Sequence, residues 1–228
     1  MKTKFFLTAA LVAMSLSASA QFTDNSASTS SASSVGNASG WGYFYVEYNP
    51  LTIKVDEKGS DDESLSAFSL GYNQAFPVSQ GAPLFIETGL GLMYATKSDF
   101  DDIDDLDFSM FSAKIPVNLM YAFQLPNSDI SIIPFGGITL RGNISGKFTD
   151  KSGKKEKEYD VFDKKDMEDC HMSIDGKAWN RLQVGWQIGL KARLGSYFLV
   201  GVSYGNDMSE IAKKTTISTT SLTVGYTF

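Results

Sequence analysis

The chain contains one cysteine, one histidine and no excess of positive charge, and each shortage excludes a class of protein. A single cysteine, Cys170, cannot form an internal disulfide, so a disulfide-stapled fold is excluded. A single histidine, His171, argues against a multi-histidine metal or catalytic centre. Lys and Arg number 20 against 26 Asp and Glu, so the basic surface of a nucleic-acid-binding protein is missing and we expect no nucleic-acid partner.

The amino terminus predicts export from the cytoplasm. Residues 1–20 contain two early lysines, an apolar stretch over 5–14, and the cleavage pattern Ala18-Ser19-Ala20. These parts, in this order, predict a signal peptide. The apolar stretch is about half of the roughly 20 residues that a transmembrane helix needs, which disfavours a membrane anchor. Residues 21–40 are rich in Ser, Ala, Asn and Gly and predict a flexible leader, so 41–228 is expected to be the folded domain.

That domain alternates between apolar and polar residues. Along 182–194 every even position is apolar and every odd position is polar or glycine. Side chains of a strand point to alternate faces, so this pattern predicts a strand with one apolar face. With this segment, eight strands are predicted, centred on residues 41–49, 65–76, 86–94, 113–123, 138–145, 182–194, 198–204 and 222–228.

Short and long connections alternate between these strands, which predicts that all long loops lie at one end. The long connections span about 50–64, 97–108, 149–180 and 206–214, and they contain 22 of the 26 acidic residues. Short turns at one end and long loops at the other are typical of outer-membrane barrels. We therefore expect an all-β fold, a single eight-stranded antiparallel up-and-down transmembrane β-barrel, with both termini periplasmic and the acidic loops outside.

Charged residues within the predicted strands lie on the polar register. A charge on the lipid face is costly, about 2 to 4 kcal/mol for Arg or Lys at the bilayer midplane, so these side chains are expected to point inward. Eight strands enclose an interior that side chains can fill, and inward glycines leave room for long side chains, which favours filling over conduction. The expected interior ion-pair network consists of Glu47, Glu87, Lys114, Arg141, Lys191 and Arg193.

Alternation alone does not say which face is outside, and a secreted lipocalin-like barrel around an apolar ligand would also alternate. The charge-free register, the alternating loop lengths and the terminal SLTVGYTF favour the membrane barrel. The terminal strand is similar to the signal read by the barrel-insertion machinery, which is thus an expected partner, together with outer-membrane lipid and lipopolysaccharide around a monomer. An interfacial aromatic girdle is expected from Tyr121, Phe123, Phe198, Tyr226 and Phe228.

Three segments carry a family resemblance. FIETGLGLMY (85–94), KIPVNLMYAF (114–123) and SLTVGYTF (221–228) resemble the PorT-like outer-membrane β-barrel family common in Bacteroidota. The resemblance covers roughly residues 41–228 and implies the barrel and its outer-membrane location. The family shares no catalytic residues, so none is implied here.

Candidate chemistry is sparse, and we expect neither an enzyme nor a cofactor. Cys170 and His171 supply two of the four ligands that zinc usually takes, so they predict no metal site, although an exposed thiol could form an intermolecular disulfide. His171 with Ser173 and Asp175 lies on one loop, where a catalytic triad rarely forms. The remaining candidate is a weak divalent-ion loop, without the Gly and Glu of an EF-hand, formed by Asp101, Asp102, Asp104, Asp105 and Asp107.

The third long loop carries a further structural signal. A Ser-Gly turn within 150–155 predicts a hairpin that projects from the barrel, whose free edge could add a partner strand. The expected role of the whole chain is structural or surface interaction through the loops. The alternatives are the soluble barrel and a narrow channel.

Overall fold

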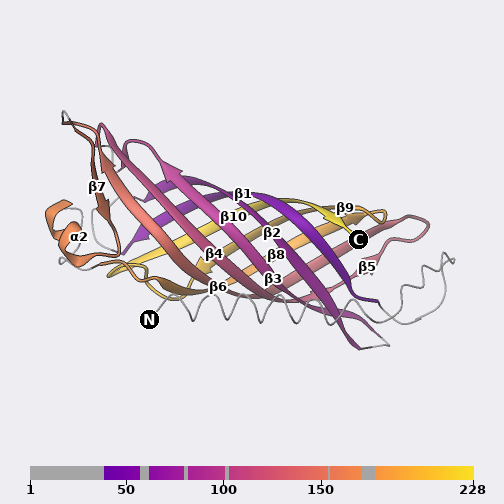
Figure 1. The fold of residues 1–228 in the computed structure, drawn as a ribbon. Helices are drawn as coiled ribbons and strands as arrows, with labels where there is room; N and C mark the ends of the chain where they lie inside the picture. Colours follow the sequence, from indigo (N-terminus) through magenta and orange to yellow (C-terminus); the bar gives the residue numbers. More distant parts are fainter. Residues whose placement is uncertain (1–38, 57–61, 80–81, 101–102, 154, 171–177) are drawn as a thin grey trace.

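A computed structural model describes residues 39–56, 62–79, 82–100, 103–153, 155–170 and 178–228. The expected signal peptide and nearly all of the leader lie outside these ranges. Within them the chain forms eight long strands, two short strands and one helix (Figure 1). The bounds are β1 Trp41–Val55, β2 Glu63–Ser79, β3 Ala82–Lys97, β4 Leu106–Tyr121, β5 Phe123–Gln124, β6 Ile130–Asp150, β7 Lys157–Asp160, α2 Lys164–Cys170, β8 Leu182–Leu194, β9 Phe198–Asp207 and β10 Thr215–Thr227.

The eight long strands close into one barrel, as the sequence predicts. Neighbours pair in the order β4-β3-β2-β1-β10-β9-β8-β6, and pairing of β4 with β6 closes the ring. Every pair is antiparallel, so this is an up-and-down barrel. The short β5 pairs with β6 at Ser131 and Ile132, beyond the end of the β4 pairing, and β7 pairs with β6 at Lys147–Asp150, beyond the end of the β8 pairing.

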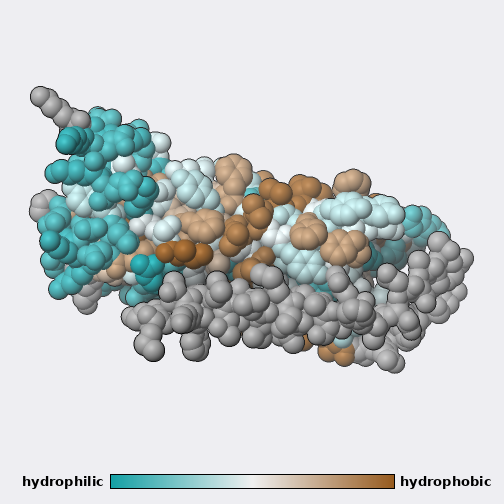
Figure 2. Space-filling model, viewed as in Figure 1, coloured by the Kyte–Doolittle hydropathy of each residue, from teal (hydrophilic) through white to brown (hydrophobic). Residues whose placement is uncertain are grey.

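The outer wall of the barrel is apolar around its middle. Outward residues such as Leu70 and Val224 are 62% and 61% exposed, and Figure 2 shows brown residues over the middle with hydrophilic residues at the loop end. Exposed aliphatic side chains in such numbers need a lipid environment. The soluble-barrel alternative is therefore wrong, because it requires the apolar register to point inward. No helix in the described ranges is long and apolar enough to cross a membrane.

The strands reach further toward the loop end than their apolar outer faces suggest. β1 continues to Val55 and β6 to Asp150, so the expected loops at 50–64 and 149–180 begin too early. In this part the polarity is inverted: Leu51 and Ile53 point inward and are buried, while Lys54 points outward and is exposed. The strands therefore continue above the lipid as a water-facing barrel with an apolar interior.

The interior has three layers. A loop-end cluster, which includes Leu51, Met110, Phe108 and Phe148, fills the lumen beneath the loops. A turn-end cluster, which includes Tyr43, Phe135 and Leu199, fills the opposite end. Between them lies a polar layer with buried Glu87, Arg141 and Lys191. The buried charges thus lie near mid-height, and apolar side chains pack at both ends.

The turn end contains the short connections, and the chain's carboxyl terminus lies there as well (Figure 1). Turns at Asn127 and Gly195 adopt φ of 56° and 64°, conformations that Asn and Gly tolerate best. These turns confirm the predicted short connections. The five girdle aromatics are exposed on the outer wall at this end, where Tyr121 contacts Phe123 and Tyr226 stacks on Tyr197.

The third loop is folded into a lid, defined here as residues 157–170, which contains β7 and α2. The predicted hairpin is confirmed, with Asp150 paired to Lys157 and Lys147 to Asp160. Asp163 caps α2, because its Oδ1 accepts hydrogen bonds from the backbone N–H groups of Lys165 and Asp166 at 2.8 and 3.3 Å. A helix of seven residues is too short to persist alone, so packing must hold it.

Cys170 does not have the exposure that the sequence suggested. It is the last residue of α2, is half-buried and packs against the loop-end cluster. The expectation assumed an extended loop, whereas in a helix Cys170 shares a face with Met167 three residues earlier, and Met167 is fully buried. His171, Ser173 and Asp175 lie outside the described residues.

Candidate functional site: the charged lumen and the lid

The centre of the lumen is a hydrogen-bonded ion pair between Glu87 of β3 and Lys191 of β8. Lys191 Nζ lies 2.6 and 2.7 Å from the two carboxylate oxygens of Glu87. Tyr43 and Asn118 also donate to Glu87, at 2.6 and 2.8 Å. Glu87 is completely buried, so its charge is stable there because four donated hydrogen bonds replace water.

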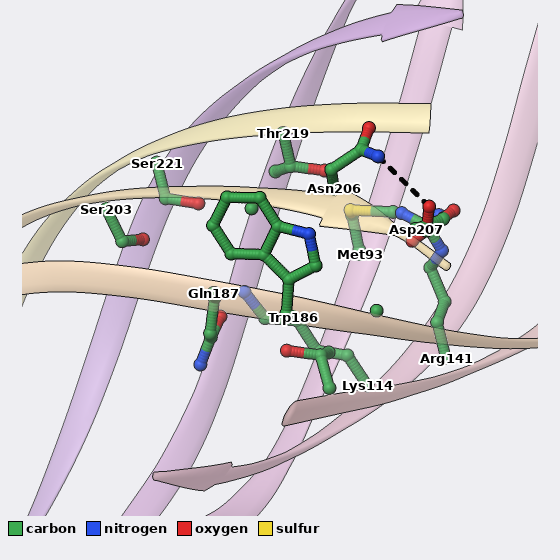
Figure 3. A pocket seen from close by; sticks show the side chains of 13 residues that line it. Met93, Lys114, Arg141, Trp186, Gln187, Ser203, Asn206, Asp207, Thr219 and Ser221 are labelled. Carbon is green, nitrogen blue, oxygen red and sulfur yellow. Dashed lines mark hydrogen bonds and ion pairs between the residues drawn. The ribbon is translucent and has the colours of Figure 1, made fainter. Parts of the chain in front are cut away.

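Two further ion pairs lie in the same layer. Glu47 of β1 pairs with Lys114 of β4 and also accepts a hydrogen bond from Thr223 at 3.1 Å. Arg141 of β6 pairs with Asp207 of β9 and donates to Gln183 through Nε at 2.9 Å. Arg141 and Asp207 meet beside the larger lumen cavity (Figure 3). The layer thereby ties together strands from every part of the barrel.

Asp207 is an interior residue that the sequence analysis placed in a loop. It is the last residue of β9 and follows the inward register of Leu199, Ser203 and Gly205. Continuing the inward register from Gly205 to the next inward position would have identified Asp207 as an interior residue. The expected set also contained four cations and two anions, an imbalance that itself indicates a missing acid.

Arg193 is separated from the other predicted lumen charges. Its guanidinium lies 4.8 Å from the ring centre of Trp41, at the turn end of the barrel. Among the described residues it forms no ion pair, in contrast to Lys114, Arg141 and Lys191. A cation over an indole ring near the interface is a favourable cation–π arrangement.

Two inward glycines give the lysine stems their space. A Cβ on Gly91 or on Gly201 would lie 3.1 Å from Cγ of Lys114 or of Lys191 respectively. These distances are tighter than ordinary van der Waals contact. The sequence expectation that inward glycines accommodate long side chains is confirmed at these two positions.

Little free space is left around the ion pairs. The larger cavity, beside Thr139, Arg141 and Asp207, measures about 40 Å³, and a second one beside Glu47 and Glu87 measures about 20 Å³. Both lie between the loop-end and turn-end clusters. Cavities of this size hold a few water molecules and no larger solute.

We therefore expect no ion conduction. Purified protein in a planar bilayer should give no current steps, because apolar side chains close the lumen above and below the charged layer. The measurement is single-channel recording at increasing protein content, with a known porin as a positive control. Stepwise currents that scale with the amount of protein would contradict the closed lumen and favour the channel alternative.

The second candidate site is the lid, which is packed as a folded unit. Val161 and Met167 are fully buried against the loop-end cluster, and Trp179 packs on the rings of Phe108 and Phe148 at centroid distances of 5.4 and 6.0 Å. Figure 1 shows β7 and α2 together at the end of the barrel opposite the carboxyl terminus. The lid thus covers the loop end with a fixed surface.

The outer edge of β7 offers fewer free backbone groups than the predicted projecting hairpin would have. The N–H of Val161 donates to Gly146, so the neighbouring N–H of Asp160 points away from β6. That outward N–H already donates to the carboxylate of Asp166 on α2, at 3.0 Å. Little edge is left for strand addition, so a partner of the lid is expected to contact side chains.

The negative charge of the second long loop, residues 97–108, is partly neutralised by Lys151, which lies between β6 and β7. Lys151 forms an ion pair with Asp107, and this hydrogen bond and charge raise the pKa of Lys151 above its usual value. The backbone N–H of Asp105 donates to Asp99 at 3.1 Å. Asp104 is exposed, whereas Asp101 and Asp102 lie outside the described residues. In the described part of the chain, no three acidic, His or Cys side chains form a metal-binding group.

The chain matches a known protein family over nearly its whole length. The profile of the outer membrane protein beta-barrel domain matches residues 6–228. No curated protein matches the chain. Similar solved structures include Ail, the attachment invasion locus protein of Yersinia pestis, which is 14% identical, with 83% of this chain and 99% of Ail covered and a TM-score of 0.47.

Two other structures give similar values. A major outer membrane protein of Thermus thermophilus is 13% identical, with 82% of this chain and 99% of that chain covered and a TM-score of 0.42. The outer membrane enzyme PagL is 13% identical, with 78% of this chain and 97% of that chain covered, also at 0.42. These values are too low to transfer a ligand, a partner or an activity. The family match spans the whole barrel, and the chain belongs to the outer membrane protein beta-barrel domain family.

Proposed function

We propose that this outer-membrane barrel is a non-catalytic anchor that presents the lid and the neighbouring loops to a partner outside the cell. The observation that carries the proposal is the packing of the lid, with Val161 and Met167 fully buried on the barrel mouth. Loops that serve merely as connections need no core of their own. A loop held in one conformation loses less entropy on binding, which favours a role in recognition.

The filled lumen supports this proposal against transport. Three ion pairs occupy the middle of the barrel, and two apolar clusters close it. Conduction would require a continuous polar path, whereas the cavities beside these pairs measure about 40 and 20 Å³. The barrel interior is better suited to holding its strands together than to moving a solute.

The proposal also covers the orientation of the barrel in the membrane and the group of barrels to which it belongs. The lid faces outward, both termini are periplasmic, the terminal strand is read by the insertion machinery, and the monomer is surrounded by outer-membrane lipid and lipopolysaccharide. The alternation of short turns and long loops supports the orientation. The segments at 85–94, 114–123 and 221–228 support a place among PorT-like barrels of Bacteroidota.

Epitope tags at opposite ends test the orientation. A tag inserted after Ser152, in the hairpin tip, should bind antibody on intact cells, whereas a tag after Asn127, in the opposite turn, should bind it only after permeabilisation. Heat-modifiable mobility on SDS gels would confirm that both tagged barrels fold. The reverse labelling pattern would refute the outward orientation.

A lid deletion tests the recognition role. Cells in which residues 155–177 are replaced by a short Gly-Ser linker should lose adhesion to at least one surface in a panel of matrix proteins and glycans. Cells that carry Lys147→Met, which leaves the lid in place, should adhere like wild type. Equal adhesion of the deletion strain and wild type across the panel would contradict a role of the lid in recognition.

A single substitution should loosen the lid without unfolding the barrel. We expect Met167→Ala to destabilise lid packing by about 2 to 5 kcal/mol, because Met167 is fully buried in the loop-end cluster. Limited proteolysis of protein in lipid vesicles should then cleave within 155–170, while heat-modifiable mobility stays unchanged. Glu168→Gln, on the exposed side of the same helix, is the control. Equal cleavage of both variants would mean that the lid is not held by this contact.

A further inference from the structure

A groove runs along the outer wall of the barrel beneath the lid. It measures about 460 Å³, which is within the range of small-molecule sites. Its floor comes from the outward faces of β3, β4 and β6, and its upper rim comes from β7 and α2. The groove therefore lies where the apolar wall passes into the hydrophilic loop end, a change visible in Figure 2.

The floor of the groove is aromatic and apolar. Tyr94 of β3 is paired directly with Phe111 of β4, so the two rings lie on the same outward face. Ile144 of β6 is the extra residue of a β-bulge, since Phe111 pairs with Ser145 and the next pair is Ser112 with Asn143. Tyr94 and Ile144 are half exposed. The floor continues downward into the apolar wall that contacts lipid.

The rim of the groove carries excess negative charge. Glu158, Asp160 and Asp166 line it, and Lys147 is the one cation among the lining residues that the structure describes. Lys147 already pairs with Glu158. Asp160 and Asp166 each accept one backbone hydrogen bond, from Phe162 at 2.8 Å and from Asp160 at 3.0 Å, and within the described ranges neither has a Lys or Arg partner.

Arg181, which lies beside Ile144 and the lid, is held by other contacts. Arg181 donates to the carbonyl oxygen of Ile144 at 2.8 Å, and its guanidinium lies 4.2 Å from the ring centre of Phe162. It therefore stabilises the bulge and the lid. The two carboxylates of Asp160 and Asp166 are left to face the groove above an aromatic floor.

We propose that this groove binds an amphipathic organic amine that is embedded in the membrane. The protonated amine is held between the carboxylates of Asp160 and Asp166 and above the rings of Tyr94 and Phe111, which attract cations through their faces. Its hydrocarbon chain follows Ile144 downward into the lipid. The charge of the rim disfavours phosphorylated or sulfated head groups in the same place.

Photolabelling tests the site directly. Wild-type protein in phosphatidylcholine vesicles is irradiated with a dodecylamine that carries a diazirine, and with the matching dodecyl alcohol as the neutral probe. Mass spectrometry of the digested protein then locates the label. The amine should label the segments 106–114 and 143–147 about fivefold more than the alcohol, as expected for a cation–π and carboxylate site that is partly exposed.

Two pairs of variants separate charge from shape. Asp160→Asn together with Asp166→Asn should reduce amine labelling to the level of the alcohol, because Asn still accepts the backbone hydrogen bonds but carries no charge. Glu168→Gln is its control. Tyr94→Leu should reduce the labelling as well, whereas Tyr48→Leu, on the outer wall of β1, should not.

The outcomes are distinct. Equal labelling by the amine and the alcohol, label spread evenly over the apolar wall, or labelling that the Asn pair leaves unchanged would each overturn the proposal. If the Asn pair fails to fold, judged by heat-modifiable mobility, the comparison of Tyr94→Leu with Tyr48→Leu decides. The proposal does not depend on an external partner of the lid, so failure of the adhesion test leaves it standing.

Discussion

Replacing Lys191 by methionine should lower the free energy of unfolding of the barrel by about 3 to 5 kcal/mol. The substitution keeps most of the side-chain volume but leaves Glu87 charged and unpaired in the lumen. The side chains of Lys191 and Glu87 are 6% and 1% exposed, so water cannot replace the lost partner. Tyr43 and Asn118 still donate to the carboxylate, which neutralises none of its charge.

The measurement is denaturant unfolding of protein in lipid vesicles, followed by the loss of heat-modifiable mobility. The double variant Glu87→Gln with Lys191→Met should recover much of the loss, because no buried charge is left unpaired. Lys147→Met is the matched control: it breaks the ion pair with Glu158, whose side chains are 46% and 61% exposed, and should cost at most about 1 kcal/mol. Equal effects of Lys191→Met and Lys147→Met would contradict the role assigned to burial.

The transmembrane part of the barrel could be predicted because one rule applies along the whole of it. Where lipid surrounds the wall, outward residues must be apolar, so Phe44 and Val46 alternate with inward Tyr45 and Glu47. Strand number, the short turns and the inward placement of Glu87 and Lys191 follow from this rule. The sequence therefore predicts both the fold and the candidates for the charged layer.

The part above the lipid could not be predicted in the same way, because there the polarity inverts. On β4, inward Phe108 and Met110 are buried while outward Asp107 and Ser109 face water. A search for outward apolar residues loses the strand at this inversion, so β4 was predicted to begin too late. Asp207 was assigned to a loop for the same reason, although it continues an inward register.

The lid and the groove depend on contacts between distant segments, which alternation does not report. Met167 and Cys170 share a helical face that becomes visible only once α2 is known to be a helix. The groove requires the bulge at Ile144, the hairpin and the hydrogen bond between Asp160 and Asp166 to come together. Each of these is a local backbone conformation that many different sequences adopt. The alternation of apolar and polar residues therefore does not predict it.

Gly137→Ala should be among the most damaging single changes in the wall, costing about 3 kcal/mol or more. A Cβ at this inward position would overlap the backbone carbonyl oxygen of Val117 and lie 2.6 Å from Oδ1 and 2.7 Å from Cα of Asn118. Backbone atoms of a paired strand cannot move aside without breaking the β4–β6 ladder that closes the barrel. Displacement of Asn118 would also remove a hydrogen bond from Glu87.

The adjacent residue supplies the control for this prediction. A Cβ on Gly136, which points outward, would meet Cγ2 of Ile188 at 3.6 Å, an ordinary contact. Gly136→Ala should therefore change stability by less than about 1 kcal/mol, and the lower entropy of the unfolded chain favours a gain. Folding yield from urea into lipid vesicles, read by heat-modifiable mobility, compares the two variants. Similar yields would mean that β4 and β6 can separate at this point, and the closure of the barrel by their close backbone approach would have to be abandoned.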